Sequence, residues 1–226
     1  MGRNGIFSGW TRAGSQRVYV RVTTAMKERA ASSNGDGLGY EGPPIVLVHG
    51  IGASSRSLKP IIHTLGEEHA VYAPDLPGFG LSDFPTHPLD VPGLAEALRR
   101  WMLDNQIVSA AVVAVSSGCQ VAVDLAARYP ELVEGLVLYG PTIDPAGRGP
   151  LRLASRWARG AVFASPTLAA HQVHDLIDAG PWRAVRSLRM ALDDPIESKL
   201  PEVEAPTLVI RGRHDQLVPR SWAERV

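Results

Sequence analysis

The stretch that most constrains the fold of this chain is Ala111–Val123, which reads AVVAVSSGCQVAV. It begins as an apolar run rich in valine that stops at Ser116, which is typical of a buried strand. After Gly118, apolar residues recur at helical spacing, namely Val121, Ala122, Leu125, Ala126 and Tyr129. The pattern predicts a strand, a sharp turn and a helix, with a serine at the apex of the turn.

The residues around this turn suit a reactive serine. Ala114 and Gly118 are small enough for the strand and helix backbones to crowd Ser116 from both sides. Such a turn, a nucleophile elbow, lifts the serine oxygen clear of the sheet and beside the N–H groups of a helix start. Two other interpretations stay open here. The serine could be inert, or residues 105–123, which carry no charge, could span a membrane, although their polar residues argue against this.

Composition narrows the classes of protein. The 226 residues suit a single domain over residues 1–226, and 23 basic residues balance 23 acidic ones. This balance argues against a nucleic acid or a membrane surface as partner. Cys119 is the one cysteine, so there is no internal disulfide, and we expect it to be a small buried hydrophobe. Residues 1–10 lack the apolar core of a signal peptide, and we expect a cytoplasmic protein. No sequence motif for a nucleotide, metal or cofactor is visible, and we expect none to be bound.

The rest of the chain predicts alternating strands and helices. Five further runs are interpreted as strands, at residues 16–23, 45–48, 70–73, 136–139 and 207–210. Helical patterns lie between them, and Asp90 is the expected N-cap of one helix. This order favours an α/β fold, a mostly parallel sheet covered by helices on both faces. Residues 142–199 interrupt the alternation with three helical patterns and no strand, and we expect them to form an inserted lid.

Several motifs, in this order, resemble those of the α/β-hydrolase fold family from residue 16 to the end. They are HGIG at 49–52, DLPGFGLS at 75–82, the elbow, the helical insertion, and Gly-x-x-Asp at 212–215. The resemblance implies that Ser116 is the nucleophile and Asp215 the acid of a catalytic triad. It also implies an oxyanion hole formed by the backbone N–H groups of Ile51 and Ser117. A serine at 116 argues against the dehalogenase and epoxide-hydrolase branches, which use an aspartate there.

The sequence departs from the family pattern at the general base. The family's histidine follows the acid in the chain, whereas no histidine follows Asp215. None of the seven histidines is a convincing substitute. His49 is expected to be structural, and His171 with His174 fits surface pairs better than a base or a metal site. Asp144 is a weaker alternative acid, and Asp75 and Asp83 are expected to fix their loop.

Two functions from different classes follow. The favoured one is a serine hydrolase that cleaves a small ester or related carbonyl substrate, C–C hydrolysis included, through an acyl-enzyme. Under it, the sequence is C-terminally truncated and lacks the last strand and the catalytic histidine. The alternative is a non-catalytic module of the same fold that binds a ligand or a protein. Four arginines follow helical spacing on one face of the insertion: Arg148, Arg152, Arg156 and Arg159. We expect this face to be solvated, and binding of an anionic substrate or partner is the weaker interpretation.

Overall fold

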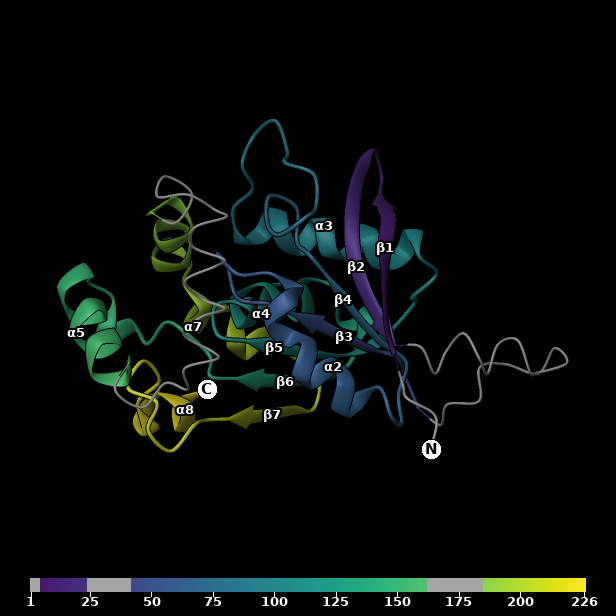
Figure 1. Ribbon diagram of the computed structural model, residues 1–226. Coiled ribbons are helices and arrows are strands. Elements are labelled where there is room, and N and C mark those ends of the chain that lie inside the picture. Colours follow the sequence, from purple (N-terminus) through teal and green to yellow (C-terminus); the bar gives the residue numbers. More distant parts are fainter. Residues whose placement is uncertain (1–4, 24–41, 162–184) are drawn as a thin grey trace, which may run out of the picture.

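The computed structural model describes residues 5–23, 42–161 and 185–226 (Figure 1). Its centre is a seven-stranded sheet with the strand order β1-β2-β4-β3-β5-β6-β7. The strands are β1 (Ile6–Ala13), β2 (Gln16–Thr23), β3 (Ile45–Val48), β4 (Val71–Pro74), β5 (Ala110–Val115), β6 (Val133–Tyr139) and β7 (Thr207–Ile210). The pairs β1·β2 and β2·β4 are antiparallel. The other five strands, β4, β3, β5, β6 and β7 in sheet order, run parallel to one another. The predicted α/β fold with a mostly parallel sheet is confirmed.

Helices cover both faces of the sheet, because the central strands are apolar on both sides. The 3₁₀ helix η1 (Ser55–Leu58) and α2 (Lys59–Leu65) pack on one face, against Ile45 and Leu47. On the other face, α3 (Val91–Asp104), α4 (Gly118–Arg128) and α8 (Arg220–Arg225) share a core with Val46 and Val48. The predicted N-cap of α3 is confirmed, since the Asp90 carboxylate accepts the Gly93 N–H at 2.8 Å.

The N-terminal hairpin corrects the sequence analysis in two ways. Residues Ile6–Ala13 form the edge strand β1, which we did not predict, and it pairs with β2 over eight positions. The alternation of apolar and polar residues over 16–23 predicts that Arg21 of β2 faces solvent, whereas its exposed fraction is only 7%. Its guanidinium hydrogen-bonds Ser55 and lies 3.8 Å from an Asp75 oxygen. Partners from distant loops therefore keep this charge inside the protein.

The insertion between β6 and β7 contains helices, as expected. They include α5 (Pro150–Ala161), a helix over residues 185–193 and the short α7 (Ile196–Lys199). The middle helical pattern, with His171 and His174, lies outside the described residues. No helix in the described ranges is long and apolar enough to cross a membrane.

The strand β7 forms the edge of the sheet opposite β1 (Figure 1). Among the described residues it pairs with β6 alone. Two of its apolar residues are open to solvent, Leu208 with 57% and Ile210 with 37% of the residue's surface exposed. This edge strand lies next to the loop that carries Asp215.

Candidate active site

The turn after β5 is a strained elbow, as the sequence predicts. Ser116 has φ of 56°, in the left-handed region that residues with a Cβ avoid. Its N–H donates to the Tyr139 carbonyl at 2.8 Å, which ties the turn to the end of β6. Two residues later Gly118 begins α4. The surrounding structure thus holds a serine in a conformation that costs about 1–2 kcal/mol relative to glycine.

Close packing against the end of β3 explains the glycine at 118. A Cβ at this position would lie 2.4 Å from the His49 carbonyl oxygen and 2.8 Å from that of Val48. Both neighbours are backbone atoms, which cannot rotate away. Ala114 and Cys119, which replace glycines of the family pattern, are both fully buried, and burial raises the pKa of the Cys119 thiol. The thiol therefore stays neutral and packs as a small hydrophobe, as expected.

The two predicted oxyanion-hole donors lie beside the elbow, and one of them is hydrogen-bonded within the protein whereas the other has no acceptor among the described residues. The Ile51 N–H donates to the Ser117 hydroxyl oxygen at 2.9 Å. The N–H of Ser117, which caps α4, meets no hydrogen-bond acceptor among the residues that the structure describes. Such a free donor at a helix start suits a developing negative charge. For Ile51 to donate to a substrate oxygen, the Ser117 hydroxyl must turn aside.

The loop residues around this site have structural roles. The His49 Nε2 accepts the Leu76 N–H at 2.9 Å, so this nitrogen carries no proton and has no access to Ser116. Asp75 accepts the Ser55 N–H at 2.7 Å with one oxygen and the Leu81 N–H at 2.9 Å with the other. These bonds brace the loop after β3 (residues 49–54, called the oxyanion loop after its predicted role) against the loop after β4, which is the structural role expected of both residues.

Asp215 follows β7, two strands away from β5 and the elbow, and both lie at the carboxyl ends of the parallel strands. Its Oδ1 accepts the N–H groups of Leu217 and Val218 at 2.9 and 3.1 Å. A Cβ built on Gly140, the residue after β6, would lie 3.4 Å from its Oδ2. The other oxygen, Oδ2, accepts no hydrogen bond from the described residues. One oxygen is thus fixed and the other is available to orient a base, as the resemblance implies for Asp215.

Asp144, the alternative acid, is engaged elsewhere. It accepts the Ala146 N–H at 3.0 Å and forms an ion pair with Arg156 at 2.9 Å. The expectation that four arginines of the insertion share a solvated face is wrong for two of them. Arg156 binds Asp144, and Arg148 binds Glu197 at 2.6 Å, with less than a quarter of either arginine side chain exposed.

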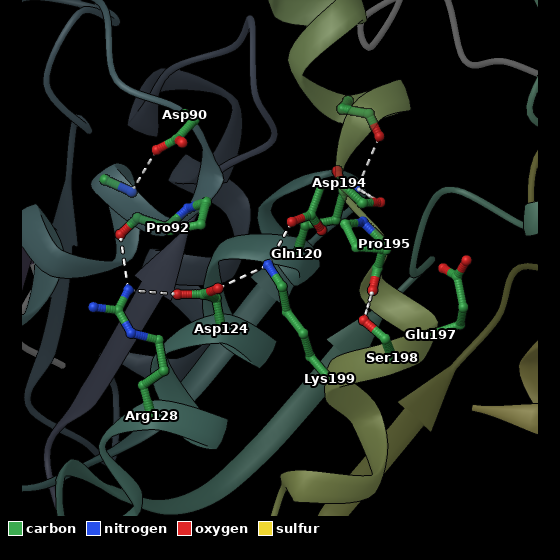
Figure 2. Close-up of polar contacts among 12 residues, drawn as sticks. Asp90, Pro92, Gln120, Asp124, Arg128, Asp194, Pro195, Glu197, Ser198 and Lys199 are labelled. Atoms are coloured by element: carbon green, nitrogen blue, oxygen red, sulfur yellow. Dashed lines mark hydrogen bonds and ion pairs between the residues drawn. The ribbon is translucent and has the colours of Figure 1, made fainter.

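Behind the elbow, a buried ionic cluster joins α4 to the end of the insertion (Figure 2). Figure 2 shows Asp124 between two cations, Arg128 at 3.0 Å and Lys199 at 2.7 Å, and Lys199 also bridges to Asp194. In the same region Gln120 donates to the Ala191 carbonyl at 2.8 Å. This cluster, absent from our sequence analysis, fixes the helix that carries the elbow.

Burial and charge oppose each other in this cluster. Burial raises the pKa of Asp194, helped by the nearby Asp124. Burial alone would lower the pKa of Lys199, but hydrogen bonds to the two carboxylates outweigh it and raise that pKa. The lysine therefore stays charged and holds the two acidic side chains together.

Known proteins match this arrangement. A model of the alpha/beta hydrolase fold matches residues 43–149. A poly(3-hydroxyalkanoate) depolymerase from Ectopseudomonas oleovorans is 30% identical over 198 residues, which cover 78% of this chain and 69% of the relative. The chain belongs to the α/β-hydrolase family. Hydrolases are also found among its other relatives, which supports an enzyme.

Two further likenesses span the α/β-hydrolase core and the insertion. A pimeloyl-[acyl-carrier protein] methyl ester esterase from Shewanella woodyi is 29% identical over 213 residues, covering 80% of this chain and 78% of the relative. The solved 2-hydroxy-6-oxo-6-phenylhexa-2,4-dienoate hydrolase from Rhodococcus sp. strain RHA1 has a TM-score of 0.74 at 21% identity, covering 98% of this chain and 86% of that one. At this identity, the structural likeness supports the fold alone.

Beside the oxyanion loop of this α/β hydrolase lies a cavity of about 280 Å³. Gly52 and Ala53, directly after Ile51 in the chain, line part of its wall. Arg186, Ser187 and Met190, from the helix over residues 185–193, line it from the insertion side. A Cβ on Gly52 would lie 3.5 Å from the Ser187 Cβ, so this helix is in contact with the oxyanion loop. Met190 thus lines a mostly apolar pocket.

Proposed function

We propose that this chain is a serine hydrolase that cleaves a small ester or a related carbonyl substrate through an acyl-enzyme on Ser116. The observation that carries the proposal is the left-handed backbone of Ser116 at the start of α4. Strain of this kind persists where the fold holds a residue for a function. The unoccupied N–H of Ser117 next to it supplies a donor where a tetrahedral intermediate would place its oxyanion.

The proposed reaction has two stages. The Ser116 oxygen attacks the acyl carbon while a base takes its proton, and the carbonyl oxygen becomes an oxyanion facing the N–H groups of Ser117 and Ile51. The intermediate then expels the alcohol, which recovers the proton, and leaves the acyl group on Ser116. Water attacks this ester by the same route, releasing the acid and restoring the serine.

We further propose that the base is a histidine between Ser116 and Oδ2 of Asp215, carried by polypeptide outside the described residues. The described histidines make no hydrogen bond to the Ser116 hydroxyl, and His49 is committed to Leu76. The open edge of β7, with Leu208 exposed, offers a place beside Asp215 for such a segment. The insertion, which lines the cavity, would serve as the lid.

Chemical rescue tests both parts of the proposal. Hydrolysis of p-nitrophenyl acetate and butyrate is measured with the wild type and with Ser116→Ala, with and without added imidazole. We expect imidazole to raise the difference in rate between the two proteins, because it enters the space that the proposed histidine would fill. Asp215→Asn should reduce this gain, because the amide supports an imidazolium poorly.

The outcomes separate the two candidate functions. A Ser116-dependent rate without imidazole would support the hydrolase and place the base within residues 1–226. Equal rates for wild type and Ser116→Ala under both conditions would overturn the proposal and favour the non-catalytic binding module. Arg100→Ala, a change at a side chain of α3 that is 63% exposed, serves as the control for handling and folding.

A further inference from the structure

The cavity beside the oxyanion loop has mostly apolar walls and two arginines among its described lining residues. Most of its wall is apolar, including Pro77, Phe79, Leu81, Phe84, Leu89 and Met190. Among the described residues that line it, the charged ones are Arg56 and Arg186. A cavity with low-dielectric walls and charges of one sign concentrates ligands of the opposite sign.

The apolar part of the wall is open to solvent. Leu81 keeps 48% and Phe84 keeps 51% of its surface exposed, although both are large hydrophobic side chains. Exposed apolar surface that lines a cavity is typical of a binding site, because a ligand that covers it removes that surface from water. The volume of about 280 Å³ suits a small molecule with a short or medium apolar chain.

Arg186 is available for an anion. Its one hydrogen bond with the described residues is a long one, 3.5 Å to the Pro88 carbonyl, and it forms no ion pair with them. Arg148 and Arg156, by contrast, are bound to carboxylates. A guanidinium without a carboxylate partner at the edge of an apolar cavity binds a carboxylate or phosphate through paired N–H groups.

We infer that this cavity binds an amphipathic anion, with the apolar chain against Phe79 and Met190 and the carboxylate at Arg186. The inference deepens the proposed function and rests on it for one step, that the bound molecule is a substrate. Gly52 lines the cavity one residue after the proposed oxyanion donor Ile51, so a ligand held there lies next to the proposed oxyanion hole. The substrate class is then an ester or related carbonyl compound that also carries a negative charge.

Binding of unreactive probes tests the inference without any need for turnover. Titration calorimetry compares octanoate with octanamide, which has the same chain and no charge. We expect octanoate to bind about tenfold more tightly at low salt, as one charge-assisted hydrogen-bonded pair allows. The preference should shrink in 0.5 M salt, which screens exposed charges.

Matched variants assign the preference to Arg186. Arg186→Gln should reduce the preference for octanoate to about threefold or less. Arg189→Gln removes the same charge from the same helix at a position that does not line the cavity, and it should leave the preference unchanged. Phe84→Ala should weaken both probes equally.

The two proposals can fail separately. Equal binding of the two probes, no binding of either, or an unchanged preference in Arg186→Gln would overturn the anion site, whatever Ser116 does. A preference that depends on Arg186, without Ser116-dependent hydrolysis, would support the site and remove the serine hydrolase. Ser116→Ala should keep the full preference, because the serine is not part of the anion site.

Discussion

The strain at Ser116 predicts an unusual order of stability for two simple variants. Ser116→Gly and Ser116→Ala both remove the nucleophile, but only glycine relieves the left-handed backbone with φ of 56°. We therefore expect the glycine variant to be the more stable of the two. At ordinary positions the order is the reverse, because glycine gains more freedom in the unfolded chain.

The size of the effect follows from two opposing terms. The left-handed conformation costs alanine about 1–2 kcal/mol relative to glycine, and the unfolded chain favours alanine over glycine by about 0.4–1 kcal/mol. Glycine should thus win by about 0.5–1 kcal/mol at 116. At Ser117, with φ of −66° and ψ of −13°, alanine should win by a similar amount.

Urea unfolding of the four variants measures this reversal. Both changes at Ser117 remove the hydroxyl that accepts the Ile51 N–H, so the loss of that bond cancels within the pair. The double difference is about 1–2 kcal/mol, or about 0.5 M in the urea midpoint for a slope near 3 kcal/mol/M. If alanine is the more stable residue at both positions, the elbow is not strained and this argument for a nucleophile is wrong.

Three further predictions concern the surroundings of the elbow. Gly118→Ala should lower the free energy of unfolding by about 1–3 kcal/mol, because the new Cβ meets backbone oxygens of β3. Lys199→Met should cost about 3 kcal/mol at neutral pH, because it strands buried carboxylates. Because the pKa of Lys199 is raised, its contribution to the free energy of unfolding is present below pH 10.5 and lost as the pH rises further. Lys199→Met should therefore show a flatter alkaline limb in its pH–stability curve. Hydrogen bonds from Arg99 lower the pKa of Glu96, so its contribution is present above pH 4.5 and lost as the pH falls below it, and Glu96→Gln should flatten the acid limb.

Thermal and urea unfolding across pH check all three. Asp90→Ala, which removes a cap without touching either ionic group, should shift the whole pH curve and leave its limbs unchanged. An alkaline limb that Lys199→Met leaves intact, or an acid limb that Glu96→Gln leaves intact, would contradict the assigned roles. Full stability in Gly118→Ala would show that β3 and α4 are less tightly packed than the structure indicates.

The strands and the elbow can be predicted from the sequence because short segments of the chain carry the information that specifies them. A continuous apolar run such as Ile45–Val48 has one stable environment, buried on both faces. The strand β1 escapes the same reasoning, because Ser8 and Gly9 interrupt its apolar pattern and its order comes from pairing with β2. Predicting it requires the partner strand as well as the segment.

The errors in the candidate site have a common physical cause. The periodicity that placed Arg21 and Arg148 in solvent is a property of one element, whereas Asp75 and Glu197 approach them from elsewhere in the chain. The bond from Lys199 to Asp124 likewise joins residues that no local pattern connects. Motif order locates the reactive serine, and tertiary contacts decide which charges stay available for a ligand.

The most direct test of the central claim is to locate a covalent adduct on the protein. The chain is incubated with a serine-directed alkyl phosphonate in the presence of imidazole, digested and mapped by mass spectrometry. The account predicts a single adduct on Ser116, reduced in Asp215→Asn and absent from Ser116→Ala. No adduct, or an adduct on Ser117 or another serine in the wild type, would contradict it.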